Sequence, residues 1–407
     1  MNAPTSQTLL QKSGPIFDSL RARRQDKRWE SFIEGLLKRL ELPKEHRARA
    51  DREYMRIGEH IASYLDLPAE RVEVFPQGSM RTCTTIKPRG NTKFDLDIVA
   101  LVSGPEFETM TPEVFFATFE GALKGLPEIC GEPEAKNRCW RLPYERLPFY
   151  FDVTPALPAG FYVPQAPLRV RDRTRGWSAS NPRELATWFE QIADMQFYFQ
   201  TNRSYVAMDA AKSITPLPDP DVDIDDILRR AIQLMKLHRD NYYFYAEPER
   251  KEAAPISIII MTLAAHSYRY LAKTRSMTAS DSLEVVLELI ELMPNFIEYD
   301  SRGPRIPNPR LEHENFADRW TTDNGARMRE FGLWHSRLMG DLELMFSEDA
   351  GRSSESRIRS VFGEDGVTAW KAMQPGNGRM FASLLSAAPL SAAPAPNRSG
   401  AARTTLS

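Results

Sequence analysis

The sequence predicts a mixed α/β lobe followed by a mostly helical lobe. Three short runs rich in β-branched and aromatic residues lie between residues 71 and 157, and they have the composition of strands. After Trp177 the apolar residues recur at the three-and-four spacing of helices. A chain of 407 residues with 42% hydrophobic content is long enough to bury a core in each lobe.

The first part of the chain is predicted to form two helices. Apolar residues follow a helical spacing from about residue 16 to residue 67, and Pro43 interrupts the pattern. We expect both helices to pack along the back of the sheet that follows.

The predicted strands are the segments RVEVFP, KFDLDIVALV and PFYFDVTPAL, which are bounded by Gly, Pro and Asn. A helix is predicted over about 112–123, between the second and third strands, so this lobe mixes helices and strands. The clearest helices of the second lobe are 181–195, 225–240, 255–272 and 282–293.

These patterns divide the chain into three predicted parts. Residues 1–190 are predicted to form the core lobe with its N-terminal helices, and residues 191–385 the helical C-terminal lobe. Residues 386–407 are rich in Ala, Pro and Ser with almost no bulky apolar side chain, so we expect a disordered tail.

Composition excludes several classes of protein. A formal net charge of −2 argues against stable nucleic-acid binding. No apolar run of about 18 residues occurs, and the N-terminus lacks the pattern of a secretory signal, so we expect no membrane association. The three cysteines lack paired spacing and fit reduced thiols, which predicts a cytoplasmic protein.

One basic run departs from the even charge of the chain. Arg169, Arg171, Arg173 and Arg175 alternate with other residues. Such runs are usually solvated, so we expect an exposed basic face, with local contacts to anions as the alternative.

The sequence places aspartates inside two of the predicted strands. Side chains alternate along a strand, so Asp95 and Asp97 project from one face while Leu96 enters the core. The two carboxylates then stand about 7 Å apart. Asp152, between Phe151 and Val153, projects in the same way from a neighbouring strand.

Three converging carboxylates require neutralising cations, because they repel one another and their pKa values rise. Magnesium binds through one or two carboxylates and the phosphates of a substrate, and paired metal ions activate a hydroxyl and stabilise the leaving oxygen. The pattern therefore predicts phosphoryl or nucleotidyl transfer.

A Gly-Ser pair precedes the first two aspartates. Gly78 would allow close approach of the backbone to a phosphate, Ser79 and nearby amides would donate hydrogen bonds, and Gln77 could assist. Alone, such a pair is a plain turn; ordered with the aspartates, it predicts a phosphate-binding loop.

These segments resemble a known family. FPQGSMRTCTTI, KFDLDIVALV and YFDVTPA are similar to the cGAS-like bacterial nucleotidyltransferases, the CD-NTases, which make cyclic oligonucleotides in the antiphage defence called CBASS. GWSASNPRELATWF, AIQLMKLHRD, PISIIIMTLAA, IPNP and ENFADRW extend the resemblance over most of residues 72–320. The fold that it implies is a polymerase β-type nucleotidyltransferase lobe with a helical C-terminal lobe.

The resemblance also implies roles for individual residues. Asp95, Asp97 and Asp152 would hold Mg²⁺, with Mn²⁺ as an alternative, and Asp152 would help to deprotonate the attacking ribose hydroxyl. Gln77 and Ser79 would contact the donor phosphates. Lys236 and Ser257 would reach the triphosphate from the helical lobe, and Lys236 lies on a helix whose apolar face leaves its charge free.

The implied substrates are ribonucleoside triphosphates, ATP or GTP among them, and the product is a cyclic di- or trinucleotide formed with release of pyrophosphate. The implied partners are a downstream effector that responds to the cyclic nucleotide and a regulatory or ubiquitin-transferase-like protein acting on the tail. Two alternatives stay open: a transferase that adds nucleotides to RNA or a small-molecule acceptor, and a non-catalytic nucleotide-binding regulator.

Overall fold

The computed structural model describes residues 28–90, 92–160, 167–195, 197, 226–274, 282–346 and 353–374. The start of the first predicted helix and the predicted tail at 386–407 lie outside these residues. No helix in the described ranges has the length and apolarity needed to cross a membrane.

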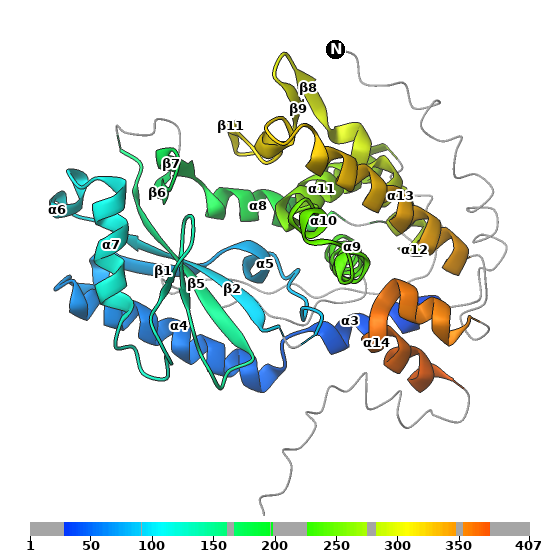
Figure 1. The fold of residues 1–407 in the computed structure, drawn as a ribbon, viewed down its shortest axis with the longest axis horizontal. Helices are drawn as coiled ribbons and strands as arrows, with labels where there is room; N and C mark the ends of the chain where they lie inside the picture. The colour runs from blue at the N-terminus through cyan, green and yellow to red at the C-terminus, as the bar shows by residue number, and fades with distance from the viewer. Residues whose placement is uncertain are drawn as a thin grey trace, which may run out of the picture.

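A mixed sheet forms the centre of the first lobe (Figure 1). The predicted strands 71–76, 93–102 and 148–157 are confirmed as β1, β2 and β5. The seven strands are β1 (Val72–Pro76), β2 (Phe94–Val102), β3 (Glu134–Ala135), β4 (Trp140–Leu142), β5 (Phe149–Pro158), β6 (Leu168–Asp172) and β7 (Gly176–Ser180). The order is β1-β2-β5-β4-β3, with β6 paired to β5 and β7 to β6. Only β2 and β5 are parallel among these pairs.

Two helices cover one face of this sheet, α4 (Lys44–Tyr64) and α7 (Pro112–Leu123) (Figure 1). The helix predicted over 112–123 is therefore confirmed. It begins at Pro112 because Thr111 caps it, accepting a hydrogen bond from the Val114 amide. An aromatic core lies between helices and sheet, with Phe115, Phe119 and Phe151 fully buried.

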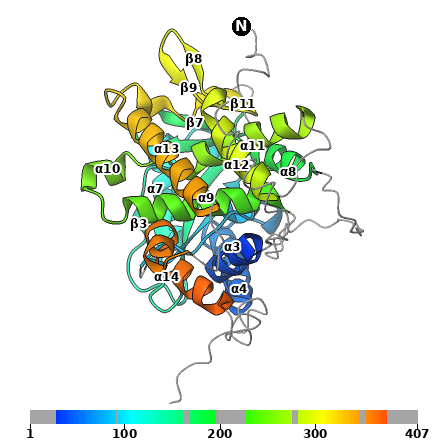
Figure 2. The same cartoon turned by 90° about the vertical axis from the view of Figure 1, so that its right-hand side faces the viewer.

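The second lobe is mostly helical, as predicted, and small strand pairs are added to it (Figure 2). Its longer helices are α8 (Pro182–Ala193), α9 (Ile227–Tyr243), α11 (Ser257–Thr274), α12 (Ser282–Leu292), α13 (Ala326–Phe346) and α14 (Glu355–Met373). The shorter elements are α10 (Pro248–Glu252), η2 (Met293–Phe296), β8 (Glu298–Asp300), β9 (Gly303–Arg305), β10 (Pro307–Asn308), β11 (Leu311–Asn315) and η3 (Asp318–Trp320). The predicted boundary at residue 190 falls within α8, and the division into lobes stays a prediction.

The first described helix, α3 (Arg28–Leu40), packs differently from the prediction. Its buried side chains, Phe32 and Leu36 among them, belong to the core of the helical lobe, and α3 lies against α9 and α14. The expected packing on the back of the sheet holds for α4 but is wrong for α3. The chain turns between the helices at Leu42 and Pro43, so the two apolar faces point into different cores.

The prediction of an exposed arginine run is wrong for two of its members. Arg169 and Arg171 lie on β6 and are buried, each paired with a glutamate of the adjoining helices, Glu108 and Glu113. Both arginines point from β6 toward α6 (Pro105–Glu108) and α7, which cover them. Because a buried guanidinium needs a charge partner, each arginine forms an ion pair with a glutamate of these helices.

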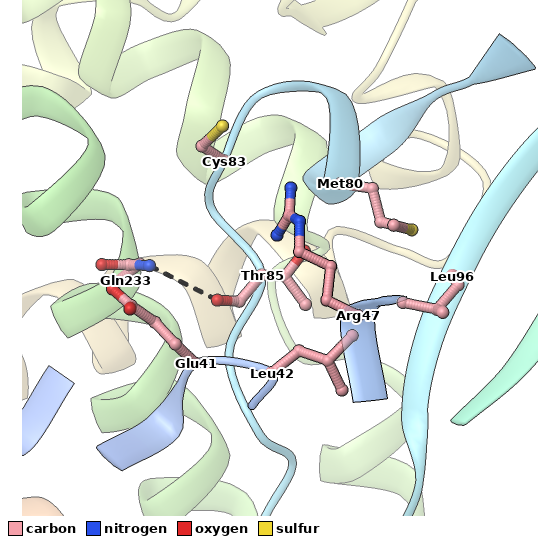
Figure 3. A pocket seen from close by; sticks show the side chains of 8 residues that line it. All are labelled: Glu41, Leu42, Arg47, Met80, Cys83, Thr85, Leu96 and Gln233. Atoms are coloured by element: carbon pink, nitrogen blue, oxygen red, sulfur yellow. Dashed lines mark hydrogen bonds between the residues drawn. The ribbon is translucent and has the colours of Figure 1, made fainter. Parts of the chain in front are cut away.

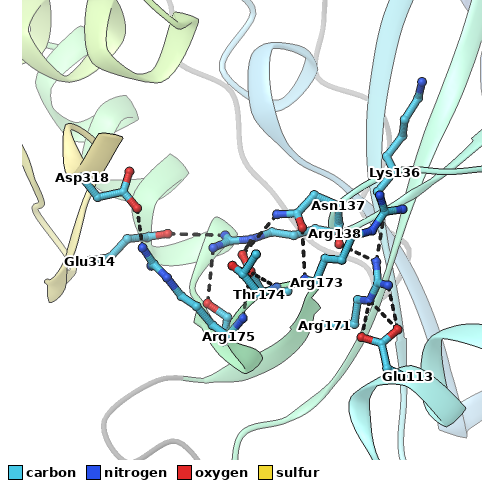
Figure 4. A network of polar contacts seen from close by, with 12 residues as sticks. Glu113, Lys136, Asn137, Arg138, Arg171, Arg173, Thr174, Arg175, Glu314 and Asp318 are labelled. Atoms are coloured by element: carbon cyan, nitrogen blue, oxygen red, sulfur yellow. Dashed lines mark hydrogen bonds and ion pairs between the residues drawn. The ribbon is translucent and has the colours of Figure 1, made fainter. Parts of the chain in front are cut away.

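The other two arginines of the run stay at the surface, and one of them, Arg175, joins the lobes (Figure 4). Arg175 pairs with Asp318 of η3 across the junction, and Arg173 contacts the backbone that leads into β4. Arg138 lies between the lobes and pairs with Asp172 and Glu314.

A small pocket lies where the loop between α3 and α4, the start of α4, residues 80–85 and α9 meet (Figure 3). Leu96 contributes to its wall, and side chains alternate along a strand, so the pocket lies behind the face that carries Asp95 and Asp97. It is therefore separate from the acidic cluster described next.

Candidate active site

The structure brings Asp95, Asp97 and Asp152 together at the parallel pair of strands. Asp97 and Asp152 are direct neighbours across β2 and β5, and Asp95 lies two residues before Asp97 on the same face. Each residue offers a carboxylate oxygen within 4.8 Å of the others. The arrangement expected from the two aspartate-bearing strands is thus present.

Strand alternation accounts for this convergence. Leu96 and Ile98 on β2, and Phe151 and Val153 on β5, are fully buried against the helices. Burial of these side chains fixes the register, and a shift by one residue would turn the carboxylates into the apolar core. The hydrophobic core therefore determines which way the acidic side chains point.

The carboxylates lie where burial and mutual repulsion disfavour their charged forms. Burial raises the pKa of both Asp95 and Asp97, and the charges of the neighbouring carboxylates raise each of them further. Among the described residues, Asp95 Oδ1 is a buried oxygen without a hydrogen-bond partner. A hard cation that binds carboxylate oxygens satisfies both conditions, so the donor set fits a divalent metal ion.

Arg141 is a site residue that the sequence did not reveal. It lies on β4 directly opposite Asp152, and its Nε and Nη2 donate hydrogen bonds of 2.8 and 2.7 Å to the two carboxylate oxygens. Its guanidinium also stacks on the ring of Tyr150, 3.9 Å from the ring centre. The apolar residues Trp140 and Leu142, which are buried on either side of Arg141, were the only feature of the sequence that indicated a strand with Arg141 on its polar face.

Gly78 lies close to the carboxylates. It begins the short helix α5 (Gly78–Arg81) with φ of +59°, and a Cβ at this position would lie 2.6 Å from Asp97 Oδ2. Both facts favour glycine over any other residue. The predicted loop is therefore held beside Asp97.

The neighbours of Gly78 are held by hydrogen bonds. The Gln77 amide N–H donates to the Asp97 carbonyl at 2.9 Å, and its side-chain Nε2 donates to Thr154 Oγ1 at 3.0 Å. Ser79 Oγ accepts a hydrogen bond of 3.1 Å from Thr85. These bonds fix the loop to β2, to β5 and to its own continuation.

Lys236 differs from the prediction of a free charge. It lies on α9, is only 6% exposed, and its Nζ donates a hydrogen bond of 2.8 Å to the Thr84 carbonyl. Since α9 is covered on nearly every side, a lysine there cannot be solvated. Burial lowers the pKa of Lys236 to about 8, and the nearby charge of Arg239 acts in the same direction, while Asp97 opposes the shift.

Ser257 is held in the helical lobe rather than at the carboxylates. It is the first residue of α11, and its Oγ accepts a hydrogen bond of 3.0 Å from Arg239. Arg239 in turn is close enough to Lys236 to influence its pKa. Arg239, which sequence reasoning did not select, therefore connects the two predicted phosphate contacts.

The mixed sheet and the helices that cover it have the polymerase β-type nucleotidyltransferase fold. Among solved structures, the CD-NTase CdnG of Bradyrhizobium diazoefficiens in complex with GTP matches with a TM-score of 0.58 and 22% identity, over 84% of this chain and 97% of that one. The 3′-deoxy GTP-bound form of Escherichia coli DncV matches with a TM-score of 0.50 and 18% identity, over 90% and 93%. These likenesses establish the fold.

Sequence comparison relates part of the chain to a known family. Residues 72–155, which contain Gly78 and all three aspartates, match the family model for the nucleotidyltransferase domain of DncV-like cyclic GMP-AMP synthases. A c-di-GMP synthase of Roseivirga ehrenbergii is 29% identical over 307 residues, which cover 72% of this chain and 73% of the relative. All of these matches support the resemblance to the CD-NTases.

Proposed function

We propose that this chain is a CD-NTase that condenses ribonucleoside triphosphates into a cyclic di- or trinucleotide with release of pyrophosphate. The observation that carries the proposal is the convergence of Asp95, Asp97 and Asp152 beside Gly78. The similar protein of Roseivirga ehrenbergii is a c-di-GMP synthase, and the similar CdnG was solved with GTP bound, which supports nucleotide substrates for this chain.

Asp95, Asp97 and Asp152 are the proposed ligands of Mg²⁺, with Mn²⁺ as an alternative. When bound, such an ion supplies Lewis-acid stabilisation of the charge that develops on the phosphate and the leaving oxygen. Asp152 has a second proposed role, because a carboxylate at this position can accept the proton of the attacking ribose hydroxyl. The three residues thus orient the nucleophile and balance charge at one place.

The loop at Gln77, Gly78 and Ser79 is the proposed site of the donor phosphates. Gly78 leaves the space in which a side chain would meet Asp97, so a phosphate can approach the loop backbone. Ser79 Oγ accepts a hydrogen bond from Thr85, which leaves its own hydrogen available to a phosphate oxygen.

Lys236 and Ser257 are the proposed contacts of the triphosphate tail. A buried ammonium group carries its charge in a medium where water screens it weakly, so its attraction for a polyphosphate is strong. Arg239 fixes Ser257 and adds a second positive charge at the same place. Below a pH of about 8 Lys236 is charged, which is the state that this role requires.

The proposed biological role rests on the resemblance to the CD-NTases. We propose that the product is a second messenger of CBASS antiphage defence, made in the cytoplasm and sensed by an effector, and that a regulatory or ubiquitin-transferase-like partner acts on the C-terminal tail. The proposal includes no stable binding to nucleic acid or to a membrane.

The test is synthesis without an acceptor. Purified protein is incubated with Mg²⁺ or Mn²⁺ and pairs of labelled nucleoside triphosphates, treated with phosphatase, and analysed by mass spectrometry. A phosphatase-resistant cyclic product, absent from the Asp95→Ala/Asp97→Ala variant, is expected. Products that form only when RNA or a small hydroxyl compound is added would instead indicate an acceptor-dependent transferase, and nucleotide binding without any product would indicate a regulator.

A further inference from the structure

Arg141 holds both oxygens of the third carboxylate of the acidic cluster. Its Nε lies 2.8 Å from Asp152 Oδ1 and its Nη2 lies 2.7 Å from Oδ2. The same Nη2 is 3.7 Å from Asp95 Oδ2. One guanidinium group therefore interacts with two of the three carboxylates.

The pair is partly withdrawn from solvent. The side chain of Asp152 is 8% exposed and that of Arg141 is 28% exposed. A bidentate arginine-carboxylate pair in such surroundings is among the stronger polar contacts in proteins, because both hydrogen bonds are charge-assisted. A metal ion that binds Asp152 must compete with these bonds.

The position of Arg141 is fixed by its strand. Trp140 and Leu142, its neighbours on β4, are buried in the core, and Trp140 Nε1 donates a hydrogen bond of 3.0 Å to the Phe116 carbonyl. Strand alternation then turns Arg141 to the face that carries Asp152. The ring of Tyr150 under the guanidinium fixes its other side.

We propose that Arg141 is a built-in counter-ion that occupies the metal side of Asp152 and is displaced when a divalent ion binds. It neutralises the cluster in the absence of metal, and it makes metal binding weaker than three bare carboxylates would allow. The inference rests on the proposed function, since it takes the cluster to be the metal site. It adds a positioning residue for Asp152 that acts on metal affinity.

The structure supplies a matched control on the same segment. Arg138, three residues earlier, makes its ion pairs with Asp172 and Glu314 instead of the acidic cluster. Its exposed fraction, 35%, is close to the 28% of Arg141. Replacement of Arg138 removes a similar charge nearby without touching Asp152.

The experiment is a titration of the full-length protein with Mn²⁺ alone at pH 8, measured by calorimetry and by the electron paramagnetic resonance signal of free Mn²⁺. Arg141→Gln should bind Mn²⁺ about tenfold more tightly than the original protein, because the competing charge-assisted bonds are gone. Arg141→Lys keeps the positive charge but cannot donate two parallel hydrogen bonds to one carboxylate. Its Mn²⁺ affinity should therefore lie between those of the original protein and Arg141→Gln. Arg138→Gln should match the original protein.

The outcomes separate the two proposals. If Asp95→Ala/Asp97→Ala binds Mn²⁺ as well as the original protein does, or if neither the original protein nor Arg141→Gln binds it, the cluster is not the metal site and the proposed function loses its basis. If the double variant loses binding but Arg141→Gln binds Mn²⁺ equally or more weakly than the original protein, the counter-ion role is wrong while the metal site stands. Circular dichroism of each variant verifies that it is folded.

Discussion

Gly78 has the tightest steric requirement in the candidate site. Alanine there would combine a left-handed backbone with a Cβ only 2.6 Å from Asp97 Oδ2. We expect Gly78→Ala to lower nucleotidyl transfer at least about a hundredfold, because misplacement of a catalytic group by about 1 Å has costs of that order. Product formation by mass spectrometry measures this.

Gly125 provides the control for backbone strain alone. It has φ of +80°, and a Cβ at this position would meet nothing within 4 Å. Gly125→Ala should lower the free energy of unfolding, measured in urea, by about 1 kcal/mol and leave the rate of nucleotidyl transfer unchanged. Equal losses of activity in the two variants would show that the contact with Asp97 does not matter.

Lys236 should give the protein a pH-dependent stability. Its pKa is about 8 when folded, below the ordinary value of 10.5, chiefly because it is buried. Between these values the unfolded chain binds a proton that the folded chain does not, so stability rises as pH rises from about 8 to 10.5, and the destabilisation is fully present below about 8. The total change is up to about 3 kcal/mol.

Lys236→Met removes the titrating group and keeps most of its volume. The difference in unfolding free energy between this variant and the original protein should therefore shrink as pH rises across that window, measured by urea titration at several pH values. A difference that stays constant with pH would contradict the buried, shifted lysine.

At the scale of elements, the short strand β4 should matter more than its length suggests. Trp140 stacks on Phe116 with ring centres 4.6 Å apart and donates a hydrogen bond to the carbonyl of the same residue. We expect Trp140→Ala to lower the free energy of unfolding by about 3–5 kcal/mol, and Trp140→Phe, which loses mainly the hydrogen bond, by about 1 kcal/mol. Chemical denaturation measures both, and equal effects would argue against the stacking.

The elements also show what sequence could predict. The strands with Asp95, Asp97 and Asp152 were predictable because their apolar neighbours alternate without interruption and fix one face. Arg141 was missed because β4 has only three residues, too few for a period to be recognised. Arg169 and Arg171 were misjudged because their glutamate partners lie 61 and 58 residues away in the chain, and composition does not reveal such pairing.

At the scale of the whole molecule, a buried hydrogen bond and exposed ion pairs join the lobes. Asn308 Nδ2 donates to Asn181 Oδ1 at 2.8 Å, and both residues are almost fully buried. We expect Asn308→Ala to destabilise the protein by about 1–3 kcal/mol because it leaves buried polar groups unpaired. Asp318→Asn, which removes the exposed partner of Arg175, should cost less than about 1 kcal/mol. Thermal unfolding compares them, and the reverse order would contradict this account of the junction.

Helix packing between the lobes was beyond sequence reasoning for a related reason. The periodicity of α3 identifies its apolar face but not the core that receives it, and that core is formed by helices about 200 residues or more later in the chain. The buried lysine of α9 likewise follows from the enclosure of this helix, which its own sequence pattern does not express.

Asp97→Asn shows whether the three converging carboxylates carry out nucleotidyl transfer. The measurement is pyrophosphate release from nucleoside triphosphates alone, titrated with Mg²⁺, beside binding of the same nucleotides. We expect at least about a thousandfold loss of pyrophosphate release in a folded variant that still binds nucleotide, because the ligand charge is lost while the side-chain shape is kept. Release at the original rate, with the same dependence on Mg²⁺, would contradict it.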